Sequence, residues 1–313
     1  MELNENAQVD TSQIDDERSS GGGGGGGGGI GGLPIGGGGL TGIIVTVLIA
    51  LVGGYFGINN LTGDSGGGTQ TGDNTSLSQE CSQSDALKQL DCRNALYVNS
   101  IQAFWAQAEP KYFHKSYQKA PTVFFSNQVS TGCGAADSGT GPFYCPADNK
   151  VYIDLTFYKL LADQLGAPGE FAQPYVMAHE YGHHIQDLVG TEAKMRQLQQ
   201  SASNSEKNLL SVKLELQADC YAGVWAKGAT GTTSSNGQKI FKSLTADDIQ
   251  QGIQTAGQIG DDTLQKQAGQ QINPQEFTHG TSADRQKWFS RGYTSGTPAN
   301  CDTFADGAVV EGD

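Results

Sequence analysis

The clearest periodic pattern after residue 80 is helical. Apolar residues recur every three or four positions from Leu87 to Trp105, and again through Met177, Tyr181 and Leu188. In the second stretch Pro174 suits the first turn of a helix and Gly190 suits its C-terminal stop. The spacing therefore predicts two amphipathic helices, one from Leu87 to Trp105 and one between Pro174 and Gly190.

Short runs of β-branched and aromatic residues predict a small sheet. Val123–Phe125 is typical of one strand, and the runs Phe143–Cys145 and Val151–Leu155 are typical of a hairpin around a polar turn. Thr245 and Ser282 suit the N-caps of two later helices. The predicted fold class is α+β and mainly α: a domain with a small sheet or hairpin, preceded by one transmembrane helix.

The first eighty residues lack the apolar content of a folded domain, apart from one span. Residues 1–39 are acidic and then almost all glycine, so we expect them to be disordered. Residues 40–58 (Leu40–Ile58) carry no charge and as a helix span about 28 Å, which predicts a transmembrane helix. Residues 59–80 have the composition of a flexible linker. Residues 81–313 would then form the folded domain. A cleaved signal peptide is the disfavoured alternative, because the region before the span is long and acidic and no A-x-A site follows it.

The cysteines favour an oxidising compartment for that domain. All six lie after the apolar span, and their number is even. No C-x-x-C pair is present, which argues against a cysteine zinc site. We favour the pairs Cys81–Cys92, Cys133–Cys145 and Cys220–Cys301. The expected location is that of a single-pass membrane protein, with its folded domain outside the cytoplasm.

One short stretch carries a specific chemical pattern, His179-Glu180-Tyr181-Gly182-His183-His184. Residues four apart lie on one face of a helix, so His179 and His183 can bind one metal ion. Glu180 lies beside them, where it can act as a general base toward a water that the metal activates. This H-E-x-x-H arrangement is that of zinc metalloproteases. His184 falls on the apolar stripe, so we expect it to be a buried structural histidine.

Catalytic zinc normally has three protein ligands, and the motif supplies two. A third histidine at H-E-x-x-H-x-x-G-x-x-H is excluded, since Gln186 and Val189 occupy those positions. Glu215 and Asp219 lie four apart on a later helical stretch, so one face of that helix carries both carboxylates. We assign Glu215 as the third ligand of one Zn²⁺ ion and Asp219 as the acceptor that orients a ligating histidine. The reverse assignment of these two carboxylates is an alternative.

Three blocks of sequence resemble the bacterial putative neutral zinc metallopeptidase family. They are H-E-Y-G-H-H-I-Q from His179, E-L-Q-A-D-C-Y-A-G-V-W from Glu215, and H-G-T-S-A-D-R-Q-K-W-F-S-R-G-Y from His279. The stretch from Cys133 to Asp154 is similar as well, and the resemblance covers most of the chain after residue 80. It implies a single-pass membrane protein with a zinc-dependent peptidase domain, and it does not imply a particular substrate.

His279 lies in a polar loop before the last predicted helix. A histidine opposite the zinc can donate a hydrogen bond to the oxyanion of the tetrahedral intermediate, so His279 is a candidate contact to the transition state. A histidine that caps or holds the fold is the alternative. The hairpin of Phe143–Cys145 and Val151–Leu155 is a candidate for pairing with an extended substrate, although an ordinary buried hairpin is equally consistent with the pattern.

Charge narrows the range of partners. The chain has a formal net charge of −14 and shows no basic patch, which argues against binding to nucleic acid. The expected partners are a peptide or protein substrate and, through Leu40–Ile58, a membrane.

The sequence therefore predicts a membrane-anchored, gluzincin-like endopeptidase that hydrolyses peptide bonds. Two alternatives stand beside it. One is a zinc hydrolase of a non-peptide amide, and the other is a non-catalytic membrane-tethered scaffold with a relic metal site. The presence of Glu180 disfavours the scaffold, because a purely structural metal site has no use for a general base.

Overall fold

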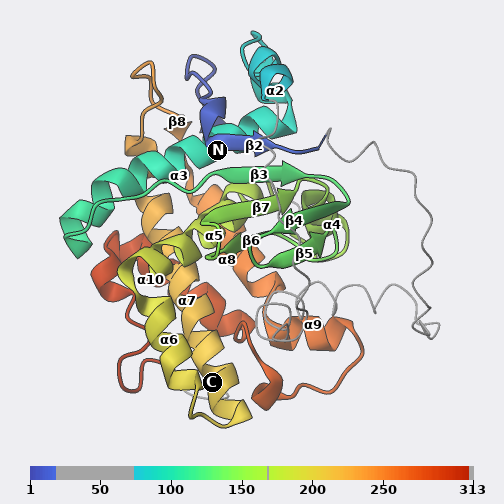
Figure 1. Ribbon diagram of the computed structural model, residues 1–313, viewed down its shortest axis with the longest axis vertical. Coiled ribbons are helices and arrows are strands. Elements are labelled where there is room, and N and C mark those ends of the chain that lie inside the picture. The colour runs from blue at the N-terminus through green and yellow to red at the C-terminus, as the bar shows by residue number, and fades with distance from the viewer. Residues whose placement is uncertain (19–73, 168, 310–313) are drawn as a thin grey trace.

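The computed structural model describes residues 1–18, 74–167 and 169–309 of the 313-residue chain. Helices make up most of this part (Figure 1). The α-helices are α2 (Thr75–Glu80), α3 (Leu90–Phe113), α4 (Phe157–Asp163), α5 (Ala172–Val189), α6 (Thr191–Gln199), α7 (Asn204–Gly228), α8 (Ala246–Gln258), α9 (Asp261–Gln267) and α10 (Ser282–Ser295). Short 3₁₀ helices cover Thr11–Gln13, Ala86–Lys88, Ala229–Gly231, Pro274–Glu276 and Pro298–Asn300.

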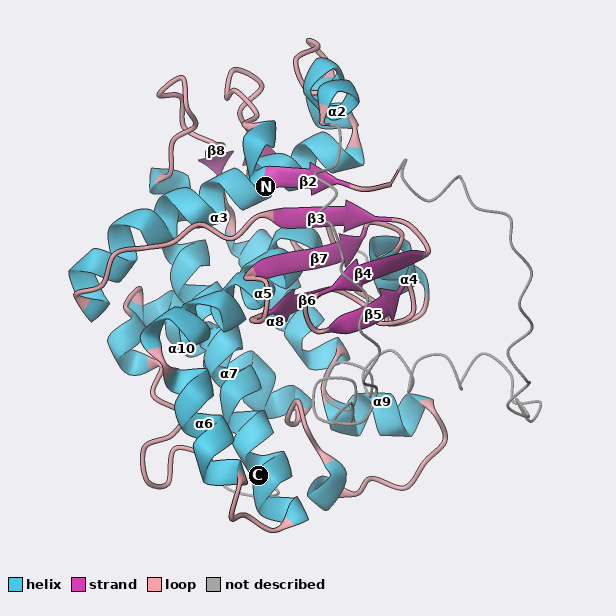
Figure 2. Cartoon of the chain, in the orientation of Figure 1, coloured by secondary structure: helices cyan, strands magenta, loops and turns pink. Residues whose placement is uncertain are grey.

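The strands form three small sheets, drawn in magenta in Figure 2. Their bounds are β1 (Glu2–Leu3), β2 (Ile14–Asp16), β3 (Thr122–Phe125), β4 (Gln128–Thr131), β5 (Gly134–Asp137), β6 (Phe143–Cys145), β7 (Lys150–Asp154) and β8 (Phe241–Ser243). The largest sheet has the order β2-β3-β7-β6, and β4–β5 and β1–β8 form separate antiparallel pairs. The predicted hairpin is confirmed as β6–β7, and the mainly helical class with small sheets is also confirmed.

Helix α5 has the ends that the sequence predicts. Pro174 lies in its first turn, and Gly190 ends it with a left-handed φ of 89°. The N–H of Gly190 donates to the carbonyl oxygens of Gln186 and Asp187, both at 3.0 Å, which satisfies the last turn of the helix. The capping box of Thr245 at the start of α8 is likewise present, whereas the N-cap of α10 is Thr281, one residue before the predicted Ser282.

Glycine residues allow α7 to pack very closely against α5 on one side and against α10 on another. A Cβ on Gly182 of α5 would lie 2.9 Å from Cα of Ala218 in α7. A Cβ on Gly292 of α10 would lie 1.9 Å from the carbonyl oxygen of Cys220, also in α7. Real Cβ atoms do not approach backbone atoms this closely. These close contacts therefore fix the position of α7, and with it the positions of its side chains, relative to α5 and α10.

In Gly182→Ala the new methyl group forces α5 and α7 apart. We expect this overpacking alone to lower the free energy of unfolding by about 1–3 kcal/mol. The better helix propensity of alanine offsets about 1 kcal/mol of this loss. Chemical denaturation measures the change. The control is Gly231→Ala, where nothing lies within 4 Å of the new Cβ. Equal stability of the two variants would contradict the close approach of the helices.

The start of the chain differs from the prediction of disorder over residues 1–39. Residues 1–18 are part of the fold: β1 pairs with β8, and β2 pairs in parallel with β3. Ile14 is fully buried, and the amino group of Met1 forms a buried ion pair with Asp248. Edge pairing and one well-placed isoleucine stabilise a segment whose composition alone looks unable to fold. The folded domain therefore does not begin at Cys81.

The predicted single-pass membrane localisation is contradicted. No helix within residues 1–18, 74–167 and 169–309 is long and apolar enough to cross a membrane. The segment Leu40–Ile58 lies outside the described residues, as do residues 19–39 and the linker up to residue 73.

Three disulfides are present, and each is one of the favoured pairs: Cys81–Cys92, Cys133–Cys145 and Cys220–Cys301. Such bonds persist in oxidising compartments. The third joins α7 to the segment after α10, so it holds the C-terminal segment against the helix that carries Glu215 and Asp219.

Candidate metal centre

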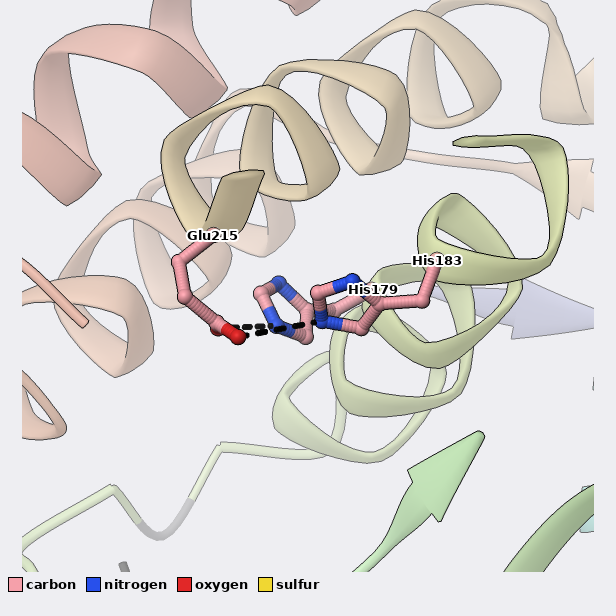
Figure 3. Close-up of side chains that lie close together, drawn as sticks. All are labelled: His179, His183 and Glu215. Atoms are coloured by element: carbon pink, nitrogen blue, oxygen red, sulfur yellow. Dashed lines mark hydrogen bonds and ion pairs between the residues drawn. The ribbon is translucent and has the colours of Figure 1, made fainter. Parts of the chain in front are cut away.

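Three side chains from two helices converge, as Figure 3 shows. His179 and His183 extend from one face of α5, and Glu215 extends toward them from α7. Nε2 of His179 lies 3.1 Å from Oε2 of Glu215, and Nε2 of His183 lies 3.4 Å from Oε1 of the same carboxylate. The structure thus brings together the three residues that the sequence assigns as metal ligands.

The spacing of these atoms fits zinc. One ligand atom from each residue lies within 4.8 Å of the others. A tetrahedral zinc site with bonds of about 2.0–2.2 Å has ligand–ligand distances of about 3.3–3.6 Å, close to the two observed separations. Two imidazoles and one carboxylate are also the ligand set of many catalytic zinc sites, in which a fourth position stays open.

Charge complementarity holds the cluster together. Burial alone would raise the pKa of Glu215, but His183, His179 and His279 hold it well below its usual value. Burial likewise opposes protonation of His179, yet Asp219 and Glu215 raise its pKa to about 10 in the absence of a metal ion. A cation is therefore favoured at the centre of this cluster, and a metal ion bound there would replace the proton of His179.

Glu180 follows His179 on α5, and it is not one of the converging ligands. Its side chain is almost fully buried. Burial raises the pKa of Glu180, while the two neighbouring histidines lower it in part. A raised pKa means that the carboxyl group holds a proton more readily, which suits a residue that must accept a proton and then release it.

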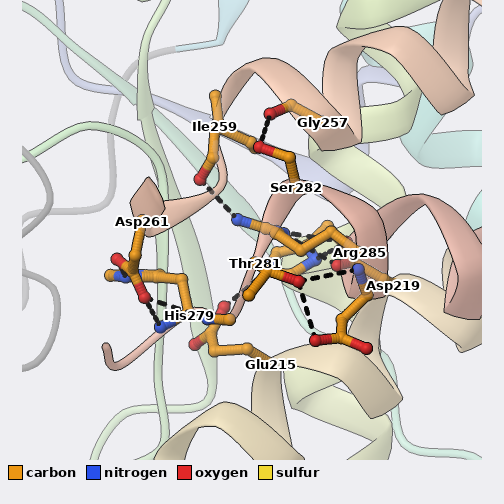
Figure 4. Close-up of polar contacts among 12 residues, drawn as sticks. Glu215, Asp219, Gly257, Ile259, Asp261, His279, Thr281, Ser282 and Arg285 are labelled. Carbon is orange, nitrogen blue, oxygen red and sulfur yellow. Dashed lines mark hydrogen bonds and ion pairs between the residues drawn. The ribbon is translucent and has the colours of Figure 1, made fainter. Parts of the chain in front are cut away.

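Asp219 lies on the far side of His179 from Glu215. Its Oδ1 atom lies 2.9 Å from Nδ1 of His179 and accepts a hydrogen bond of 2.5 Å from the hydroxyl of Tyr175. The guanidinium of Arg285 contacts both carboxylate oxygens (Figure 4). Asp219 therefore lies against Nδ1 of His179, which is the contact that the sequence predicts for it.

His183 has a corresponding partner that the sequence does not indicate. Its Nδ1 atom lies 2.8 Å from Oε1 of Gln186, and the amide of Gln186 donates to the carbonyl oxygen of Leu214 at 2.6 Å. Sequence reasoning used Gln186 only to exclude a third histidine. The spacing of three residues on one helix was the available signal, since His183 and Gln186 face each other at i and i+3.

His279 is buried and lies between Asp261 and Glu215 (Figure 4). Its Nδ1 atom lies 3.2 Å from Oδ1 of Asp261, whose other oxygen accepts from the backbone N–H of Thr278, His279 and Gly280. Its Nε2 atom has no hydrogen-bond partner among the described residues. Asp261 was not indicated by the sequence. The structure thus gives His279 both a partner on one nitrogen and an unused second nitrogen.

His184, by contrast, is structural, as predicted. It is fully buried, and its Nε2 atom lies 2.7 Å from the carbonyl oxygen of Gln118 while Nδ1 lies 3.2 Å from the hydroxyl of Tyr144. Burial lowers its pKa. It anchors α5 to the loop before β3 and does not face the metal centre.

Comparison with known proteins agrees with this geometry. The family described as putative neutral zinc metallopeptidase matches residues 3–304. The uncharacterized protein YpfJ of Escherichia coli (strain K12) is 44% identical over 272 residues, which is 87% of this chain and 88% of that protein. The uncharacterized protein Mb2605 of Mycobacterium bovis is 44% identical over 231 residues, 73% of this chain and 75% of that protein. No significant match to a solved structure was found.

Proposed function

We propose that this chain, which belongs to the family of putative neutral zinc metallopeptidases, is a zinc-dependent endopeptidase that hydrolyses peptide bonds. The observation that carries the proposal is the convergence of His179, His183 and Glu215 within 4.8 Å, with Glu180 beside them on the same helix. A structural metal site needs the three ligands, but it does not need Glu180.

The residues divide the chemical work. A zinc ion held by His179, His183 and Glu215 would polarise the scissile carbonyl and lower the pKa of a water molecule. Glu180 takes a proton from the attacking water and passes it to the leaving amine. Its burial suits this exchange, because a desolvated carboxylate holds a proton more readily than an exposed one.

His279 is proposed to stabilise the charge that develops on the carbonyl oxygen. Although burial lowers the pKa of its imidazole, Asp261 and Glu215 raise it above the ordinary value, which favours the form with a hydrogen on both nitrogens. With Nδ1 held by Asp261, Nε2 is left to donate toward the reacting carbonyl. A buried donor aimed at developing charge is worth more than one in water.

We expect His279→Phe to lower kcat by about 100–1,000-fold while zinc affinity changes by no more than a few-fold, because one oxyanion donor is lost and no ligand is. Steady-state kinetics on a fluorogenic peptide and a zinc competition assay measure the two effects. His114→Asn, at an exposed site, is the control. An unchanged kcat together with a lower melting temperature would make His279 a residue that only holds the fold.

The substrate backbone is proposed to pair with β6. This strand is an edge of the four-stranded sheet, and an edge strand has unpaired N–H and C=O groups that an extended peptide can use. Tyr144 of β6 donates a hydrogen bond of 2.9 Å to Asp187 of α5. The edge is therefore fixed to the helix that carries His179 and His183.

A substrate panel tests the reaction class. The purified full chain with one equivalent of zinc is incubated with an unfolded protein, with peptides, and with small non-peptide amides. We expect internal cleavage of the unfolded protein and of the peptides. Turnover of the small amides alone would favour the non-peptide hydrolase, and turnover of nothing by a folded, zinc-loaded chain would favour the scaffold.

A further inference from the structure

Arg285 is fully buried, and its guanidinium forms an ion pair with one carboxylate, that of Asp219. It extends from α10 toward α7, where Nε donates to Oδ2 of Asp219 at 2.8 Å and Nη2 donates to Oδ1 at 3.1 Å. Its other contacts are neutral: Nη1 donates to the carbonyl oxygen of Ile259 at 3.1 Å, and Nη2 lies 3.4 Å from the hydroxyl of Tyr175. Figure 4 shows Arg285 and Asp219 together with Glu215.

Four contacts hold Asp219 within the described residues. Oδ1 lies against His179, Tyr175 and Arg285, and Oδ2 accepts from Arg285. An ionised carboxylate has about two acceptor positions on each oxygen, so Oδ1 is fully used and Oδ2 is used in part. These contacts turn Asp219 toward His179, although it lies one helical turn from Glu215 on the same face of α7.

The arrangement also determines which nitrogen of His179 faces the metal centre. The ring lies between two carboxylates, with Asp219 at Nδ1 and Glu215 at Nε2. A carboxylate that is held in place and accepts from Nδ1 leaves the lone pair of Nε2 for the metal. Were Asp219 free to turn, it would compete with Glu215 for the ion.

Helix packing alone does not explain the ion pair between Arg285 of α10 and Asp219 of α7. Helices α7 and α10 already meet through close contacts between Gly292 and Cys220 and between Gly223 and Phe289. A buried ion pair adds little stability once its desolvation is included, so its presence at an apolar helix crossing indicates another role.

We propose that Arg285 is a positioning residue of the metal centre: its two nitrogens hold Asp219 against Nδ1 of His179, so that Nε2 of His179 and the carboxylate of Glu215 face the ion. This inference rests on the metal centre of the proposed function, and it concerns how that centre is held rather than which substrate it cleaves.

The test compares Arg285→Gln, Arg285→Lys and the control Arg291→Gln in the full chain. Arg291 lies on the same helix but is exposed, and its guanidinium stacks over Trp288 at 4.9 Å. The measurements are zinc affinity by chelator competition, the visible spectrum of the cobalt-substituted protein, and the melting temperature of the metal-free protein. Kinetics on a peptide is a separate measurement.

We expect Arg285→Gln to weaken zinc binding by about 10–100-fold and to change the cobalt spectrum, as loss of an outer-shell partner does. Arg285→Lys restores the charge but cannot grip both oxygens, so we expect it to recover only part of the affinity. Arg291→Gln should match the wild type. Wild-type zinc affinity and cobalt spectrum in Arg285→Gln, with only a lower melting temperature, would overturn the proposal.

Tyr175→Phe decides the matter if Arg285→Gln does not fold. It removes one donor to Asp219 and keeps the ring. We expect a several-fold weaker zinc affinity and a changed cobalt spectrum, and an unchanged spectrum and affinity would overturn the proposal. A wild type that binds zinc but cleaves no peptide refutes the peptidase function and leaves this test valid. A wild type that binds no zinc refutes both.

Discussion

Glu180→Gln is expected to lower kcat for peptide cleavage by about 10²–10⁴-fold while zinc stays bound, since a general base contributes about that factor to such a reaction. Glutamine keeps the size and the hydrogen-bonding capacity of the side chain but cannot take a proton at neutral pH. The ligands His179, His183 and Glu215 are untouched, so the metal content should remain that of the wild type.

Kinetics and zinc analysis of the same preparation test this expectation. The control is Glu170→Gln, the same substitution at an exposed position just before α5. If Glu180→Gln cleaved peptides at the wild-type rate, another group would have to be the base. If it lost its zinc, Glu180 would belong among the ligands.

Glu215→Ala is expected to weaken zinc binding by more than the 10–100-fold that follows loss of an outer-shell partner, and cleavage should fall with the metal content. Two imidazoles remain, which is one protein ligand short of a catalytic zinc site. The negative charge that His179 and His183 share is lost as well.

The control for this variant is Lys213→Ala, the same truncation two residues earlier on α7. Zinc competition assays on both variants give the result. Wild-type affinity in Glu215→Ala would remove Glu215 from the site and make Asp219 the ligand, which is incompatible with the contacts of Arg285 and Tyr175 on Asp219.

The convergence of His179, His183 and Glu215 was predictable from sequence because these side chains lie at fixed spacings on two helices. His179 and His183 repeat at four residues, and so do Glu215 and Asp219, and a helix places such residues on one face wherever it lies in the fold. The residues that escaped prediction depend on which helices meet. Nothing in the local sequence shows that Arg285 of α10 contacts Asp219, or that Asp261, the first residue of α9, lies beside His279.

The N-terminal segment, residues 1–18, is a part of the fold that the sequence did not predict. Periodicity and composition made residues 1–18 look disordered, because strands of two or three residues have no measurable period. Their order comes from partners far along the chain, β3 and β8, and from a buried ion pair between Met1 and Asp248. The predicted single-pass membrane localisation is contradicted by a different finding: no helix within the described residues is long and apolar enough to cross a membrane.

Restoring activity by zinc titration tests the central claim most directly. The full chain is stripped with a chelator, zinc is added back in fractions of an equivalent, and cleavage of an unfolded protein is followed. We expect activity to be absent from the stripped chain, to rise linearly, and to level off at one equivalent of zinc. Full activity in the stripped chain, or no activity at any zinc level, would contradict the assignment of His179, His183 and Glu215 as the catalytic metal centre of a peptidase.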